Sequence, residues 1–177
     1  MESDFGRFIA GLQTAGSRMD AHYFRIIVYG AREPIYRERV YCYELYHQLR
    51  VALGDDFEYK LDGELDKIKH PALLRLVASK PDLLVHVPGE MTRNLAVVEV
   101  KPVDTRVDRL HDDLLKLKGF LDYAQYFRGI MLVYSNVRQE IPDWIREQVH
   151  QFQEPRIALV WHVLGESPQV VNVGHEL

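Results

Sequence analysis

Asp82, Glu99 and Lys101 are the residues whose types and spacing point most directly to chemistry. Each lies at the end of an almost wholly apolar segment, where a charge is costly unless it is paired or bound to a metal. Two opposed carboxylates repel each other, and a divalent cation between them makes both of them ligands. Oxygen ligands favour Mg²⁺ or Mn²⁺ over zinc. A lysine beside the cation can orient a water molecule and stabilise charge on a phosphate.

The positions of these three residues can be related through a hairpin. Two apolar runs are predicted to form strands buried on both faces and joined by a polar connection: Asp82–Val87 and Leu95–Val100. A symmetric connection places Val87 opposite Asn94, and the constant position sum of an antiparallel pair then places Asp82 opposite Glu99. Lys101, two residues further on, shares their face. The sequence therefore predicts that two carboxylates and an ammonium group converge at one end of the hairpin.

Other periodic segments predict the elements that must hold this hairpin. Apolar residues at helical spacing and capping signals predict helices over residues 5–12, 36–53, 107–124 and 142–152. Runs rich in β-branched and aromatic residues predict strands over 22–29, 57–61, 129–134 and 156–163, with an edge strand over 169–173. Residues 67–79 can be read as a loop or, after Pro71, as a short helix. This order predicts an α/β fold, in which a mixed central sheet is flanked by helices.

The motif and the order of elements together resemble a known family. Pro81-Asp82, sixteen intervening residues and then Glu99-Val100-Lys101 resemble the motif of the PD-(D/E)XK nuclease superfamily, whose fold is restriction-endonuclease-like. Over residues 36–163 the element order is also similar to the family core of a helix, three strands, a helix and a further strand. The resemblance implies a small stand-alone nuclease that hydrolyses phosphodiester bonds.

The resemblance also implies roles for individual residues. Asp82 and Glu99 would hold Mg²⁺ (or Mn²⁺ as a substitute) together with the backbone carbonyl of Val100. Lys101 would be the catalytic cation. Glu44 matches the position of a glutamate that many members supply from the first helix, as a further catalytic residue and metal ligand.

Nucleic acid, with DNA favoured, is the partner that this resemblance implies. Lys+Arg total 22 against 26 Asp+Glu, a formal net charge of -4, so bulk charge does not favour coating a polyanion. A local patch, a metal ion, a homodimer or a companion protein is expected to supply the contact. Glu64, Lys67 and Lys80 are candidate substrate contacts, and a solvated loop is the alternative interpretation of these residues.

Several charged or reactive residues have a simpler interpretation. In the helix predicted over 107–124, Lys116 could contact phosphate, but the interleaved acidic residues, Asp113 among them, favour an ordinary solvated face. His86 is expected to be a satisfied core or rim histidine, and Cys42 a small buried apolar group.

Two alternatives to the metal site remain open. In the structural one, Asp82 begins a strand as a turn residue, while Glu99 and Lys101 form a cross-strand ion pair. In the functional one, the chain is a catalytically inactive module of the same fold that binds protein or nucleic acid. The acidic net charge favours the inactive module, and the intact Asp82, Glu99 and Lys101 count against it.

Composition sets the frame for all of these predictions. With 177 residues, 47% of them hydrophobic and 27% charged, the chain has the size of one soluble domain. We expect an N-terminal extension and strand over 1–30, a nuclease-like core over 34–163 and an edge strand or tail over 164–177. A single cysteine excludes an internal disulfide, and neither a secretory leader nor an apolar run of membrane-spanning length is visible. These features predict a cytoplasmic protein that does not associate with a membrane.

Overall fold

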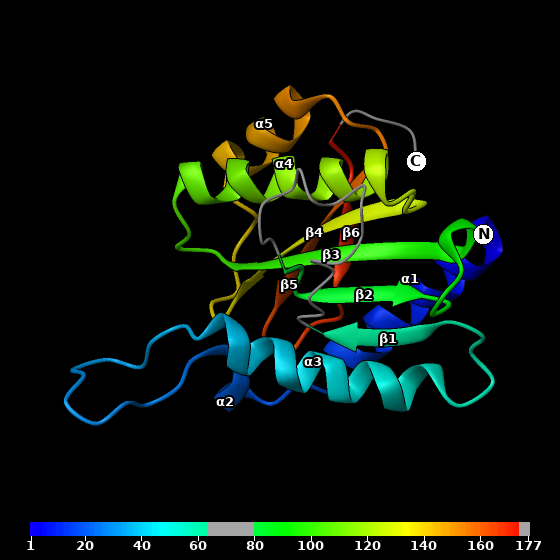
Figure 1. The fold of residues 1–177 in the computed structure, drawn as a ribbon. Coiled ribbons are helices and arrows are strands. Elements are labelled where there is room, and N and C mark those ends of the chain that lie inside the picture. The colour runs from blue at the N-terminus through cyan, green and yellow to red at the C-terminus, as the bar shows by residue number, and fades with distance from the viewer. Residues whose placement is uncertain (64–79, 174–177) are drawn as a thin grey trace.

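A computed structural model describes residues 1–63 and 80–173, which form a six-stranded mixed sheet flanked by helices (Figure 1). The helices are α1 (Glu2–Gly16), α2 (Ala21–Phe24), α3 (Glu38–Leu53), the 3₁₀ turn η1 (Met91–Arg93), α4 (Val107–Tyr123) and α5 (Asp143–Phe152). The strands are β1 (Lys60–Gly63), β2 (Leu83–His86), β3 (Asn94–Pro102), β4 (Arg128–Ser135), β5 (Ile157–Val163) and β6 (Gln169–Val171). The predicted α/β class is confirmed.

The strands follow one another across the sheet in chain order. β1, β2 and β3 form an antiparallel meander, β3, β4 and β5 run parallel, and β6 returns antiparallel to β5. Parallel neighbours need a crossover, and α4 supplies it between β3 and β4, as α5 does between β4 and β5. The carboxyl ends of β3, β4 and β5 therefore lie at the same edge of the sheet.

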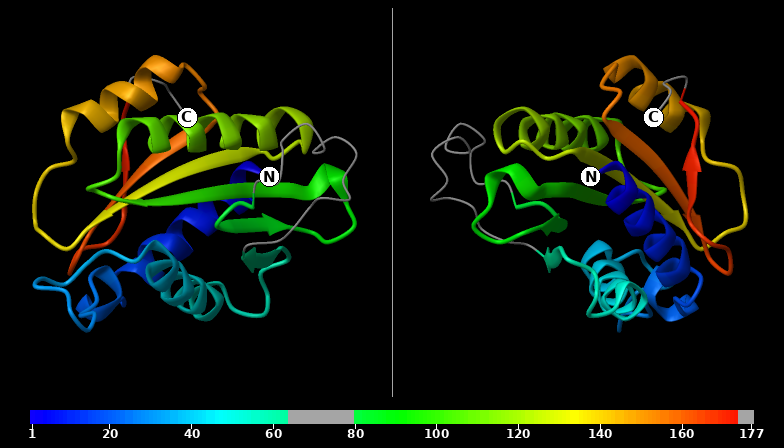
Figure 2. Two further views of the ribbon diagram at one scale, coloured as in Figure 1. Left: turned by 60° about the vertical axis from the view of Figure 1, so that its left-hand side comes forward. Right: turned by 90° about the vertical axis from the view of Figure 1, so that its right-hand side faces the viewer.

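Alternation along the strands separates two cores. On one face, side chains such as those of Val98 and Val100 pack with α1 and α3. On the other face, Leu84 and Val97 pack with α4 and α5. Figure 2 shows the same layers, with the sheet between the two groups of helices. Asp82, Glu99 and Lys101 share the parity of the second face, because successive strand residues point to opposite sides.

The first helix of the resemblance forms as the sequence predicts. In α3 the stripe of Tyr41, Leu45, Leu49 and Leu53 is buried against the sheet. The helix ends at Gly54, whose φ of 70° is easily adopted only by glycine. The buried stripe fixes which side of α3 faces the sheet.

The other predictions are met to different degrees. Helices and strands predicted from residue 82 onward form within a few residues of their expected bounds, whereas the expected strand over 57–61 is displaced to Lys60–Gly63. The predicted helix over 5–12 extends to Glu2–Gly16. Residues 67–79 lie outside the described part of the chain. No helix in the described ranges 1–63 and 80–173 is long and apolar enough to cross a membrane.

The strand predicted over residues 22–29 is wrong. The side chain of Asp20 accepts a hydrogen bond of 2.9 Å from the backbone N–H of His22, which caps the short helix α2 instead. The rest of the segment leaves the sheet, and its pairing is a single bridge between Ile26 and Ile35. The β-branched run has the local propensity of a strand, but no strand of the described sheet is available to pair with it.

Candidate active site

The start of β2 and the end of β3 bring Asp82 and Glu99 together. Leu83 pairs with Val98 and Leu84 with Val97, so the same register, continued by one residue, places Asp82 opposite Glu99 as predicted. The expected pairing of Val87 with Asn94 is wrong, because a register shift after Val85 pairs His86 with Asn94. The irregularity is confined to the turn end, and the charged end keeps its predicted alignment.

Asp82 is held by the backbone of the neighbouring strand. Its Oδ2 accepts a hydrogen bond of 2.7 Å from the N–H of Val100. Burial and the nearby carboxylate of Glu38 raise the pKa of Asp82 to about 6, although Lys101 and the Val100 N–H oppose the shift. The Asp82 carboxylate is therefore oriented by the fold, yet its charge is not fully compensated.

Glu99 is the most buried of these groups, with 1% of its surface exposed. Its Oε2 accepts a hydrogen bond of 2.7 Å from the ammonium of Lys116, while Oε1 is buried without a hydrogen-bond partner among the described residues. Burial, followed by the charge of Asp82, raises the pKa of Glu99 well above its ordinary value. An unpaired buried carboxylate oxygen costs free energy, and this one lies on the same face as Asp82.

Lys101 joins both helical layers at the end of β3. Its Nζ lies 2.9 Å from Glu38 Oε2 of α3 and 2.9 Å from Asp113 Oδ2 of α4. It also donates a hydrogen bond of 3.1 Å to the carbonyl oxygen of Val100. Burial favours the neutral amine, but Asp113 and Glu38 keep the pKa of Lys101 above its ordinary value. Lys101 is thus a fixed cation in the described structure.

The structural alternative of a Glu99–Lys101 ion pair does not describe the contacts of these two residues. Glu99 pairs with Lys116, and Lys101 pairs with Glu38 and Asp113. Lys116 also lies 2.9 Å from Asp113, so the cluster is continuous from α3 to α4.

The contribution of α4 differs from the sequence prediction, in which Asp113 and Lys116 belong to a solvated face. Asp113 is in fact buried, and 20% of the Lys116 side chain is exposed. A sequence signal for this existed, because Asp113 stands three residues after Leu110 and four before Leu117, both in the buried stripe. Residues at those spacings share a helix face, and this one is directed at β3.

The contribution of α3 comes from a different glutamate than predicted. Glu38, in the first turn of the helix, reaches Lys101, whereas Glu44 accepts a hydrogen bond of 2.7 Å from Gln48 on its own helix. Six residues rotate the direction of a side chain by roughly two-thirds of a turn. Glu38 and Glu44 therefore point to different sides of α3, and Glu38 is the α3 carboxylate that contacts Lys101; the catalytic and metal-binding role expected of Glu44 stays a prediction.

The remaining predicted residues are placed as follows. Lys80 is exposed, just before the motif, and Glu64 and Lys67 lie outside the described residues. His86 Nε2 lies 2.7 Å from Asp62 Oδ2 and is buried, which confirms a satisfied rim histidine. Cys42 is buried as expected, and burial and the neighbouring Asp82 carboxylate raise the pKa of its thiol.

The charges of the cluster do not cancel. It contains four carboxylates and two ammonium groups, a formal charge of -2 when all are ionised: Glu38, Asp82, Glu99, Asp113, Lys101 and Lys116. One divalent cation would balance this charge. The unpartnered Glu99 Oε1 and the carboxylate of Asp82 are oxygen donors of the kind that Mg²⁺ and Mn²⁺ prefer. On charge and donor chemistry the residues fit such a cation, although no set of three or more His, Cys, Asp or Glu side chains in the described residues is arranged to hold a metal.

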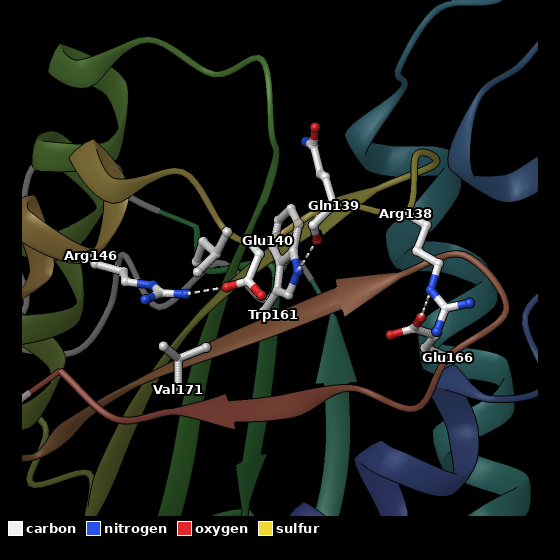
Figure 3. A pocket seen from close by; sticks show the side chains of 8 residues that line it. Arg138, Gln139, Glu140, Arg146, Trp161, Glu166 and Val171 are labelled. Atoms are coloured by element: carbon white, nitrogen blue, oxygen red, sulfur yellow. Dashed lines mark hydrogen bonds and ion pairs between the residues drawn. The ribbon is translucent and has the colours of Figure 1, made fainter.

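A separate hollow of about 430 Å³ lies beside the carboxyl end of β5 (Figure 3). Its charged groups pair with one another, Arg146 with Glu140 at 3.3 Å and Arg138 with Glu166 at 2.9 Å. The indole N–H of Trp161 donates to the carbonyl of Gln139 at 3.2 Å. Because these charges are already compensated, the hollow lacks the unbalanced charge of the Asp82–Glu99 cluster.

Comparisons of the chain with protein-family models, with curated proteins and with solved structures find no match.

Proposed function

We propose that this protein is a Mg²⁺-dependent nuclease of the PD-(D/E)XK superfamily, with a restriction-endonuclease-like fold, which hydrolyses phosphodiester bonds in DNA. The observation that carries the proposal is the opposed pair of half-buried Asp82 and fully buried Glu99, with a lysine two residues further on the same strand face. The raised pKa values of Asp82 and Glu99, in a cluster whose formal charge is -2 when every group is ionised, support it, because perturbed groups of this kind gather at functional sites. We also propose that the protein acts in the cytoplasm, as the sequence leads us to expect.

Each residue has a role that follows from its contacts. Asp82 and Glu99 would hold the cation, and the Val100 carbonyl, which accepts a hydrogen bond from Lys101 here, would be the third oxygen donor that the motif implies. A bound Mg²⁺ would supply Lewis-acid stabilisation of the phosphate charge and a water of lowered pKa. Lys101, kept protonated by its carboxylate partners, would place a positive charge beside the phosphate and orient the attacking water.

The two helices would support these groups rather than react. Glu38 and Asp113 each contact the Lys101 ammonium and so fix its position at the strand end. Lys116 holds Oε2 of Glu99, which leaves Oε1 free to act as a ligand. We propose these three as positioning residues.

The test is incubation of the protein with single-stranded and duplex DNA and RNA in Mg²⁺ or Mn²⁺. Lys101→Met, which keeps the aliphatic chain and removes the charge, should lower cleavage at least about 1,000-fold. Lys118→Met is the matched control, since Lys118 is an exposed lysine of α4 that pairs with Asp122 and Glu154. Cleavage by Lys101→Met at the wild-type rate would exclude the mechanism.

A second candidate, an inactive module of the same fold that binds protein or nucleic acid, is favoured by one observation. Lys101 and Lys116 already lie in ion pairs with the acidic residues, so the cluster is partly self-neutralised. If the protein is such a module, its melting temperature should be the same in millimolar Mg²⁺ or Mn²⁺ as in EDTA. Wild-type protein that neither cleaves any nucleic acid of the panel nor responds to metal would decide for the module.

A further inference from the structure

A projecting arm, residues 25–37, connects α2 to α3. Its two sides are joined by reciprocal backbone hydrogen bonds of 2.9 Å between Ile26 and Ile35. In Figures 1 and 2 the arm extends beyond the N-terminus of α3, on the side of the molecule where β3 ends. Glu38, the residue that follows the arm, is the α3 contact of Lys101. The arm and the candidate active site are therefore directly connected along the chain.

The tip of the arm is apolar and exposed. A turn closed by a 3.0 Å hydrogen bond from Ala31 N–H to Val28 O contains Gly30 with φ 83°. Tyr29, in the second position of this turn, is fully exposed, and Ile27 is 85% exposed. Residues 26–31 carry no charged side chain. The ring of Tyr29 is thus exposed at the tip and does not pack against the rest of the described structure.

The base of the arm is anchored, in contrast to its tip. Tyr36 donates a hydrogen bond of 2.5 Å to Asn136 Oδ1 in the loop after β4, and its ring packs edge-on against Tyr134. The guanidinium of Arg25 lies 5.2 Å from the centre of the Tyr36 ring. These contacts tie the base of the arm to the carboxyl edge of the sheet.

Three exposed charged residues lie between the tip and Glu38 and give this stretch a net charge of +1: Arg32, Glu33 and Arg37. The protein carries a net charge of -4, so local cations of this kind are needed wherever it meets a polyanion. An aromatic side chain with nearby cations is the arrangement that binds single-stranded nucleic acid, by base stacking and phosphate contact. The arm presents both elements on the segment that leads directly into Glu38, a member of the cluster proposed to cut phosphodiester bonds.

We propose that the arm binds a single-stranded segment of the nucleic-acid substrate, with Tyr29 stacked on an unpaired base and Arg32 and Arg37 on the phosphates that lead to Lys101. This inference rests on the proposed function and names its substrate as nucleic acid with unpaired bases. A contact between the arms of two copies is disfavoured. Two exposed apolar side chains cover far less than the roughly 800 Å² per partner of a stable interface, and the arginines of both copies would converge.

The experiment measures binding separately from cleavage. In the Lys101→Met background with EDTA, fluorescence anisotropy follows a labelled single strand of about 15 nucleotides and a blunt duplex of the same sequence. Tyr29→Ala should weaken single-strand binding about 5- to 150-fold, the range expected for one lost stacking contact. The matched control is Tyr123→Ala, an exposed tyrosine at the far end of α4, which should leave binding unchanged.

The arginines give a second, independent readout. Arg32→Ala should lower the slope of log affinity against log salt by about 1 for either probe. Arg50→Ala, an exposed arginine in the last turn of α3, should leave that slope unchanged. Melting temperatures should stay at the wild-type value for both tip and control variants, since the substituted side chains are exposed.

Each outcome bears on the arm. Equal binding by Tyr29→Ala and Tyr123→Ala overturns the inference, as does a Tyr29→Ala variant that elutes from gel filtration as a smaller species, which would indicate a contact between copies. Binding that depends on Tyr29, in a protein whose wild type cleaves nothing, supports the arm while the proposed hydrolysis fails. If Tyr29→Ala changes neither cleavage nor binding, the proposed nuclease activity is retained and the proposed role of the arm is excluded.

Discussion

Helix α4 takes part in two ionic clusters that use the same residue types and differ in outcome. Toward β3, Asp113 and Lys116 join the cluster around Asp82 and Glu99. Near the end of the helix, Lys118 and Asp122 join a second cluster with two residues that precede β5: Glu154 and Arg156.

The second cluster satisfies its charges. Arg156 Nε and a terminal guanidinium nitrogen lie 2.8 and 2.7 Å from the two carboxylate oxygens of Glu154. These hydrogen bonds lower the pKa of Glu154 to about 2, and Lys118 and Arg156 also lower the pKa of Asp122. Two acids face two bases, so the pairing is balanced and holds the start of β5 to α4.

In the first cluster the pKa values of Asp82 and Glu99 shift in the opposite direction: that of Asp82 is raised to about 6, and that of Glu99 well above its ordinary value. Burial there outweighs the pairing, because four acids share two lysines. In a network that serves only stability, we would expect ion pairing of the carboxylates to outweigh the cost of burying them. The comparison teaches that pairing dominates in one cluster and burial in the other, where the carboxylates of Asp82 and Glu99 are incompletely compensated, as is common for groups at functional sites.

The largest expected effect is on cleavage. Glu99→Gln should lower phosphodiester hydrolysis at least about 1,000-fold, because it removes a charged ligand from the site. Glu154→Gln, the equivalent change in the balanced cluster, should leave the rate unchanged. Rates measured at equal protein concentration, with circular dichroism as a check of folding, decide this. Equal rates for the two variants would show that the clusters do not differ in function.

Metal should stabilise only through the unbalanced cluster. At about 100 times its dissociation constant, Mg²⁺ or Mn²⁺ should raise the free energy of unfolding of the wild type by about 2.7 kcal/mol. Asp82→Asn should lose this response and Glu154→Gln should keep it. Metal affinity should also fall below pH 6, where protons compete for Asp82. Urea unfolding with metal or EDTA measures both effects, and a response that survives Asp82→Asn would contradict the site.

Without metal, Asp82→Asn should stabilise the protein. Because the pKa of Asp82 is raised to about 6 by folding, the ionised carboxylate costs stability above that pH and the protonated one does not. In EDTA at pH 8 we expect a gain of about 2 kcal/mol, which shrinks as the pH falls through 6 toward 4. Asparagine can still accept the hydrogen bond from Val100. Urea unfolding across this pH range would refute the prediction if the variant were less stable at pH 8.

Glu154→Gln should have the opposite sign and a smaller effect. The lowered pKa of Glu154 means that its ionised form stabilises the fold above pH 4.5, and that this contribution is lost as the pH falls toward about 2. We expect a loss of about 1.5 kcal/mol at pH 7 from the charge-assisted hydrogen bonds to Arg156. The gap from wild type should close in acid. A variant as stable as wild type at pH 7 would mean that this cluster contributes nothing to stability.

Much of this arrangement could be predicted from sequence because its rules are local. Period-two alternation and the position sum of an antiparallel pair placed Asp82 opposite Glu99, and the apolar stripe of α3 identified its buried side. The same local rules failed for residues 22–29. Their β-branched composition predicts a strand, but a strand needs a partner, and Asp20 caps a short helix there instead.

The identities of the supporting residues depended on packing between elements. Whether Glu38 or Glu44 reaches Lys101 is decided by how α3 lies across the end of β3, a relation that no spacing within α3 contains. Asp113 and Lys116 look like members of a charged surface until α4 is placed over the sheet.

Sequence therefore determined the pair Asp82–Glu99 and the lysine that follows, since neighbouring strands of a hairpin transmit their register directly. Tertiary structure decided which residues reach this pair from elsewhere: Glu38 from α3, and Asp113 and Lys116 from α4. The balance of charge, and with it the raised pKa of Asp82, depends on burial and on these distant partners. Burial exists only once the two helical layers close on the sheet.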